Sequence, residues 1–156
     1  MKQSDNVCLD LYSKCLSKLQ IDFIKESPSV IKDVIRLLKY WNHTEWIGLT
    51  STCIEMIVVH EFRNDDTSRR FHFVDLLCAA IRSICVYSEL KITWTDYYSP
   101  ENYNSIHSSQ PVILDPTNPY NNLHPGDNNP RKYNLQRIQC EATKLLARIM
   151  KHLPRI

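Results

Sequence analysis

Apolar residues recur with a helical period along most of the chain, and this pattern predicts five helices. The expected ranges are 7–24, 28–41, 50–59, 70–88 and 132–153. Ser27 and Pro28 are typical of the N-cap and first residue of the second helix. The third range, which Thr50, Ser51 or Thr52 can cap, is apolar nearly all round. That pattern indicates a central buried helix.

A long proline-rich loop is expected at about 90–130, because six of the eight prolines lie there and helix cannot run through them. Two short apolar runs, Ile92–Trp94 and Val112–Leu114, are expected to be extended, and the remainder is expected to be loop. At 156 residues and 43% hydrophobic content, the chain suffices for one compact domain. We therefore expect a mainly α single domain over 1–156, a helical bundle with one long loop.

Charge is distributed unevenly along the chain. Residues 131–156 carry seven Lys or Arg against one Glu, giving +6, whereas the other 130 residues carry twelve against sixteen, giving −4. A basic segment of this kind is compatible with a polyanionic partner, although a solvated helix face is the commoner explanation.

The cysteines and the hydropathy indicate a compartment. The six cysteines include no C-x-x-C pair, which fits a reducing environment better than a disulfide framework. No apolar run is long enough to span a membrane, and the first residues lack a signal pattern. We expect a soluble chain in the cytoplasm or nucleus.

The second predicted helix carries a basic stripe. Lys32, Arg36 and Lys39 are spaced i, i+4, i+7 and fall within about 60° of one another on a helix. Three cations in a row can hold a polyphosphate or follow an RNA backbone. A solvated face of an amphipathic helix explains the same pattern equally well.

An aromatic group, Trp94, Tyr97 and Tyr98, lies in the proline-rich region. Such rings can stack on nucleic-acid bases. More often they pack a loop against a hydrophobic core, and we favour that interpretation here.

Three sequence words occur in a characteristic order: IRLLKYW at 35–41, ITWTDYY at 92–98 and PVILDPTNPYNNL at 111–123. Together they resemble the C-terminal domain of the 2′-5′-oligoadenylate synthetases, the double-stranded-RNA sensors of innate antiviral immunity. The resemblance runs over about 9–153 and covers only the second half of such an enzyme. It implies the helical fold of that domain, membership of a nucleotidyltransferase family, and ATP and Mg²⁺ as the ligands of the whole enzyme.

The resemblance implies an ATP site on two elements. Arg36 and Lys39 match the residues that contact the triphosphate of a bound ATP. Ser51 and Thr52 stand where the family has a Gln-Tyr pair near the adenine. Their short hydroxyls reach less far than an amide, so adenine recognition is expected to be weakened.

The resemblance also implies contacts with RNA. Lys25 and Ser29 match positions that touch the phosphate backbone of the duplex, and Lys32 extends the same basic surface. Ile21 stands where the family usually has an arginine, so one RNA contact is expected to be lost.

Catalytic carboxylates are missing from the sequence pattern. Nucleotidyl transfer uses two or three carboxylates that converge on Mg²⁺, usually with a first pair spaced i, i+2 on a strand. No two acids in this chain have that spacing, and the adjacent Asp65 and Asp66 are expected to lie in a solvated loop. We assign no catalytic residue, no metal ligand and no cofactor to this chain alone.

Three functional hypotheses follow. The first is a shortened, catalytically silent synthetase-like protein that binds double-stranded RNA, ATP phosphates or both. The second is the C-terminal part of an active synthetase whose nucleotidyltransferase lobe is supplied elsewhere, so that an uncovered apolar face would cause self-association. The third is a helical protein-interaction domain, for which reversing the charges of Arg36 and Lys39 would leave all binding unchanged.

Overall fold

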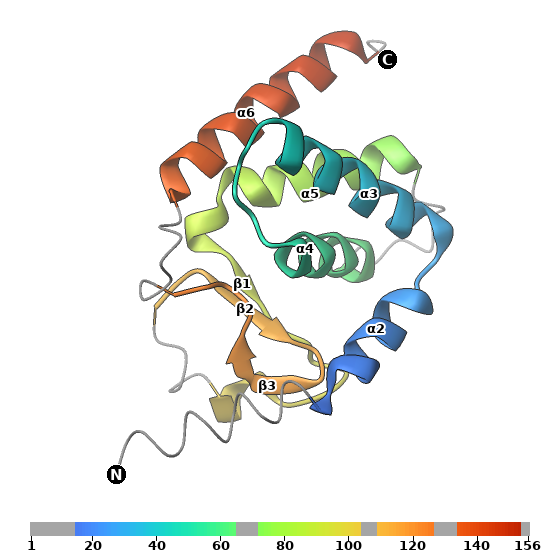
Figure 1. Cartoon of the computed structure of the whole chain (residues 1–156), viewed down its shortest axis with the longest axis vertical. Helices are drawn as coiled ribbons and strands as arrows, with labels where there is room; N and C mark the ends of the chain where they lie inside the picture. The colour runs from blue at the N-terminus through green and yellow to red at the C-terminus, as the bar shows by residue number, and fades with distance from the viewer. Residues whose placement is uncertain (1–14, 65–71, 104–108, 127–133, 154–156) are drawn as a thin grey trace.

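The computed structural model describes residues 15–64, 72–103, 109–126 and 134–153. Within these ranges the chain is mainly helical with one small sheet, which confirms the predicted fold class (Figure 1). The start of the first predicted helix, 7–14, lies outside the described residues. The α-helices are α2 (Ser17–Lys25), α3 (Ser29–Thr44), α4 (Ser51–Asn64), α5 (Phe73–Cys85) and α6 (Leu135–His152).

Helix α4 forms the centre of the bundle. Figure 1 shows it end-on, with α3 and α5 beside it and α6 on the outer side of α5. The burial of α4 on nearly every side confirms the prediction of a central helix, and its buried side chains are Cys53, Ile54, Met56, Ile57, Val58 and Val59. Because this helix touches both neighbours, its first turn has a fixed position relative to α3.

A three-stranded sheet lies at the opposite end of the molecule from α6 (Figure 1). Strand β1 (Lys91–Ile92) pairs in parallel with β2 (Val112–Asp115), and β2 pairs antiparallel with β3 (Asn118–Asn122). Two 3₁₀ helices, η1 (Tyr87–Glu89) and η2 (Pro100–Tyr103), precede and follow β1 in sequence. The predicted segment Val112–Leu114 is confirmed by β2. Of the predicted segment Ile92–Trp94 only Ile92 lies in a strand, because β1 ends there.

The expectation that the rest of the proline-rich region is loop is wrong at β3 and η2. Strand β3 contains Pro119, which lacks a backbone donor. It is tolerated because β3 is an edge strand, where donors need no partner on the open side. The side chain of Asn118 accepts a hydrogen bond from the Tyr120 N–H at 3.1 Å, which supports the strand locally.

The start of α3 also differs from the expectation. Pro28 occupies the N-cap position and the helix begins at Ser29. The Ser27 hydroxyl instead donates to the carbonyl of Phe23 at 3.2 Å, so it closes the last turn of α2. The predicted cap therefore serves the preceding helix.

The loop between α3 and α4 is held tightly. Both amide atoms of Asn42 bond to the backbone of Leu49, each at 2.9 Å. Gly48 has a φ of 94°, a conformation that side chains beyond glycine rarely adopt. Thr50 caps α4 by accepting the Cys53 N–H at 3.2 Å, which confirms one of the predicted caps. This loop fixes where α4 begins relative to α3.

Candidate functional site

Helix α2 is attached to the rest of the molecule at a few points. None of its residues is buried, although Phe23 and Ile24 pack partly against the core. The Phe23 ring meets Trp94 edge-on, with ring centres 5.3 Å apart. In the same last turn, the Lys32 ammonium of α3 donates to the Lys25 carbonyl at 2.6 Å. A cation at the last carbonyls of a helix is favourable, so Lys32 stabilises the end of α2.

A buried carboxylate supplies the main polar anchor of α2. Asp115, at the end of β2, is fully buried and accepts a hydrogen bond from the Gln20 side-chain amide of α2. It also accepts from the Thr117 N–H at 2.8 Å, the Thr117 hydroxyl at 2.7 Å and the Asn121 amide at 3.3 Å. One carboxylate therefore shapes the β2–β3 turn and links it to α2.

A cavity of about 330 Å³ lies between α2 and α4. Its wall includes Lys25 and Ile21 from α2 and Thr52 and Glu55 from α4, completed by Gln20, Ile24 and Met56. The structure thus brings together a predicted RNA contact, Lys25, and a predicted base-proximal residue, Thr52. Ile21 is 52% exposed at this wall, where the resemblance implies a longer cation.

Lys39 forms an ion pair with Glu55, whose carboxylate is 2.5 Å from the lysine ammonium. Because Glu55 lines the cavity, Lys39 lies beside it. Both side chains are partly buried, with 34% of Lys39 and 22% of Glu55 exposed. The sequence did not predict this partner. Any anion that binds Lys39 must displace the Glu55 carboxylate or share the ammonium with it.

The other predicted residues are more open. Arg36 is exposed and pairs with Asp33 one helical turn earlier, at 2.6 Å, an arrangement that contributes little to stability. Ser29 and Ser51 are both exposed, each at the first position of its helix. The cavity therefore brings Lys25 and Thr52 close together, and Glu55 connects Lys39 to them through its ion pair. Arg36, Ser29 and Ser51 belong to the surface of α3 and α4.

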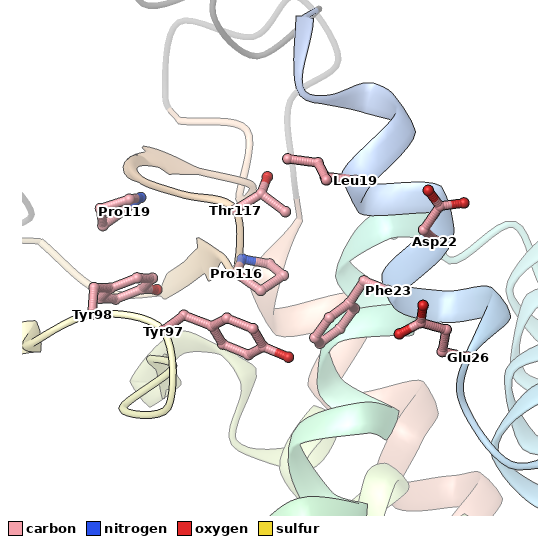
Figure 2. Close-up of a pocket in the computed structure, with 9 residues that line it drawn as sticks. All are labelled: Leu19, Asp22, Phe23, Glu26, Tyr97, Tyr98, Pro116, Thr117 and Pro119. Atoms are coloured by element: carbon pink, nitrogen blue, oxygen red, sulfur yellow. The ribbon is translucent and has the colours of Figure 1, made fainter.

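A second cavity, of about 610 Å³, separates α2 from the β2–β3 turn. Figure 2 shows the Phe23 and Tyr97 rings side by side, with the Asp22 and Glu26 carboxylates on the α2 wall. Two carboxylates repel phosphate, so this cavity does not fit the anionic ligand of the basic stripe. Of these two cavities, the one between α2 and α4 is lined by a predicted phosphate contact, Lys25.

The aromatic group mainly packs. Trp94 is buried, and its indole N–H donates to the Leu114 carbonyl at 2.6 Å, which confirms the packing interpretation for this ring. Tyr97 is 52% exposed, but its ring is partly covered because the Arg63 guanidinium lies 5.4 Å from the ring centre. The same guanidinium lies 4.8 Å from the centre of Phe23. These cation–π contacts hold the last turn of α2 against the loop that carries Tyr97.

The described residues do not supply a metal site. Among them, no group of three His, Cys, Asp or Glu side chains is placed to hold a metal ion. Glu55 is already paired with Lys39, so the donor set near the basic stripe does not suit Mg²⁺. We assign no chemical step to a metal in this part of the chain.

Comparison with known proteins identifies the family. Residues 2–152 match the family described as 2′-5′-oligoadenylate synthetase 1, domain 2, C-terminus. The chain belongs to the 2′-5′-oligoadenylate synthetase family. Rat 2′-5′-oligoadenylate synthase 1A is 27% identical over 128 residues, which is 74% of this chain and 36% of the rat protein. Rat inactive 2′-5′-oligoadenylate synthase 1B is 28% identical over 149 residues, covering 88% of this chain and 38% of the relative.

The family match concerns the C-terminal domain, and the chain spans little more than a third of these relatives. Mouse 2′-5′-oligoadenylate synthase 3 is 29% identical over 126 residues, only 11% of its length. This chain is thus similar both to relatives named simply as synthases and to one that is named inactive. In the described residues, no helix has the length and apolar character required to cross a membrane.

Proposed function

We propose that this domain binds the phosphates of double-stranded RNA through Lys25, Ser29 and Lys32, and those of ATP through Arg36 and Lys39. The observation that supports the proposal most directly is the cavity between α2 and α4, which Lys25, Thr52 and Glu55 line together. RNA duplexes are recognised mainly by shape and phosphate, so such a surface needs no base-specific pocket.

Lys39 contributes to this site by exchanging partners. A phosphate oxygen replaces the Glu55 carboxylate, because both accept the same N–H donors and the lysine is partly open to solvent. Lys32 acts differently from a free cation. Its ammonium is held by the Lys25 carbonyl, so it fixes the end of α2 and thereby the place of Lys25.

Thr52 and Ser51 lie nearest to the base of the bound nucleotide. Thr52 lines the cavity and Ser51 is exposed beside it. A hydroxyl can donate or accept one hydrogen bond at short range but cannot span to a base edge as an amide does. We therefore expect phosphate to contribute most of the affinity, with little preference for adenine.

The domain acts by binding, in the cytoplasm, as part of innate antiviral defence, and it is catalytically silent by itself. Similarity to a relative named inactive 2′-5′-oligoadenylate synthase 1B over 88% of this chain supports this reading. So does the missing i, i+2 carboxylate pair.

Equilibrium binding of ATP tests the nucleotide half of the proposal. Arg36→Glu/Lys39→Glu should abolish measurable binding, because two attractive contacts become repulsive. Arg82→Glu/Lys91→Glu, which changes two exposed cations on α5 and β1, makes the same change in net charge and should leave affinity within twofold. Equal loss in both variants would show that net charge, rather than this site, controls binding.

A second candidate function is that this chain completes an active synthetase whose nucleotidyltransferase lobe comes from elsewhere. It is favoured by the share of the relatives that the chain covers, 36% of rat synthase 1A. Synthesis of 2′-5′-oligoadenylate would then require this chain together with such a lobe and double-stranded RNA. Product formed only by the mixture would support this function, and absence of product with a well-folded lobe would argue against it.

A further inference from the structure

Helix α6 carries a line of exposed cations that the proposed function does not use. Arg137, Lys144, Arg148 and Lys151 are all exposed and are spaced i, i+7, i+11 and i+14. At 100° per residue they fall within about 60° of one another, and at 1.5 Å per residue they extend over roughly 21 Å. The four Lys and Arg residues of the basic C-terminal segment that the structure describes therefore lie on one face of one helix, which we call the α6 basic face.

The opposite side of α6 is fixed to the bundle. Ile138 and Ala142 are fully buried in the core, and Leu145 and Ile149 pack partly against it. The apolar stripe of the helix is consequently occupied by α5 and η1. An amphipathic helix that binds a bilayer inserts its apolar stripe, so this arrangement disfavours a membrane as the partner.

Few of the positive charges on this face are neutralised. The carboxylate of Glu141 accepts from Lys144 at 2.7 Å, and Arg137 donates to the neutral carbonyl of Glu45 at 3.1 Å. Within the described part of the chain, Arg148 and Lys151 form no ion pair. The face thus keeps an excess of three positive charges.

The electrostatics of Glu141 show how close these cations are. The hydrogen bond from Lys144 lowers the pKa of Glu141, and the charges of Lys144, Arg137 and Arg148 lower it further. The hydrogen bond to Glu141 raises the pKa of Lys144, and the nearby charge of Arg148 acts against that rise. Lys144, Arg137 and Arg148 therefore all lie near the single carboxylate of Glu141. Their mutual repulsion would be reduced by a row of bound anions.

We propose that the α6 basic face is a second polyanion-binding surface, which follows the phosphate backbone of a nucleic-acid duplex. Its length matches about six phosphates of one strand at ~3.4 Å per charge along the axis. Figure 1 shows α6 at the opposite side of the bundle from α2, so this surface is separate from the α2–α4 site. It does not depend on that site being functional.

The test uses Arg148→Glu/Lys151→Glu, with Lys18→Glu/Lys91→Glu as a control of equal charge on α2 and β1. Binding to a duplex RNA of about 20 base pairs is measured at two salt concentrations, since about 16 base pairs accommodate a double-stranded-RNA-binding domain. At about 0.1 M salt, losing two phosphate contacts should weaken binding roughly 60-fold and reduce the log–log salt slope by about 2. The control should stay within a few-fold of the unmodified chain.

A third variant, Lys25→Glu/Lys32→Glu, separates this proposal from the proposed function. If both surfaces contact RNA, each double variant weakens binding and the losses multiply when they are combined. Loss only in the α6 variant supports the α6 basic face and refutes the RNA part of the proposed function.

Loss only in the α2–α3 variant overturns the α6 proposal and leaves the proposed function intact. An equal loss of RNA affinity in the Lys18→Glu/Lys91→Glu control would show that net charge explains the effect of the α6 variant, and this would also overturn the α6 proposal. Anionic-lipid vesicles serve as the competing probe, and binding to vesicles without binding to duplex RNA would assign the face to a membrane instead.

Discussion

Replacing Asp115 should damage the fold in a way that depends on the replacement. This buried carboxylate accepts four hydrogen bonds, two from Thr117, one from Gln20 and one from Asn121. Asp115→Ala leaves several donors without an acceptor, and each unsatisfied buried donor costs about 1–3 kcal/mol. Since some donors can turn toward water, we expect a total loss of about 3–5 kcal/mol.

Asp115→Asn provides a matched control for that loss. The retained oxygen can still accept from the Thr117 N–H and hydroxyl, while the new NH₂ group faces the amides of Gln20 and Asn121. Both of those amides can rotate by 180° and present their oxygens. We therefore expect a loss of only about 1 kcal/mol.

Urea unfolding measures both variants. With a slope of about 2 kcal/mol per M, the midpoint should fall by roughly 2 M for alanine and about 0.5 M for asparagine. Asparagine as damaging as alanine would refute the hydrogen-bond reasoning, and so would alanine within about 1 kcal/mol of the unmodified chain. An unchanged slope in all three proteins confirms that midpoints report stability.

Three further predictions concern other groups. Glu55→Gln removes the carboxylate that pairs with Lys39, so ATP should bind about fivefold more tightly, as expected from an ion pair of about 1 kcal/mol. Unchanged or weaker ATP binding in titration calorimetry would argue against partner exchange. Burial opposes ionisation of Glu61, but hydrogen bonds and a neighbouring histidine outweigh it and lower its pKa. Stability from this group is complete above its ordinary pKa of about 4.3 and is lost as pH falls through the lowered value, so Glu61→Gln should flatten acid unfolding followed by circular dichroism. Burial raises the pKa of the Cys53 thiol, whereas Cys140 is exposed. A thiol reagent should therefore label Cys140 in the native protein and Cys53 only after unfolding. Equal labelling of the two cysteines in the native protein, measured by mass spectrometry, would contradict the packing.

The helices were predictable because burial follows a simple period. Helix α4 shows this best, since a run that is apolar on all sides can only be stabilised at the centre of a bundle. Strand β3 could not be found in the same way. Its two ladder positions, Asn118 and Asn122, are paired with β2, and nothing local to a segment containing Pro119 specifies that pairing.

The sequence suggested which residues could belong to the candidate site, but it did not predict which partners their side chains would contact. Helical spacing placed Lys32, Arg36 and Lys39 on one stripe, yet their present partners come from other elements or from Asp33. The Lys39–Glu55 pair joins residues sixteen positions apart. Such contacts depend on how α3 packs on α4, which no periodicity encodes. The structure thus adds a positioning role for Lys32, whose ammonium holds the last carbonyl of α2.

Duplex-RNA binding by Lys25→Glu/Lys32→Glu, compared with Arg82→Glu/Lys91→Glu at two salt concentrations, tests the central claim most directly. The account predicts that the first variant weakens binding roughly 60-fold at about 0.1 M salt and reduces the log–log salt slope by about 2. It predicts near-normal affinity for the second variant. If the first variant instead keeps the affinity and salt slope of the unmodified chain, the surface between α2 and α4 is not an RNA-binding site.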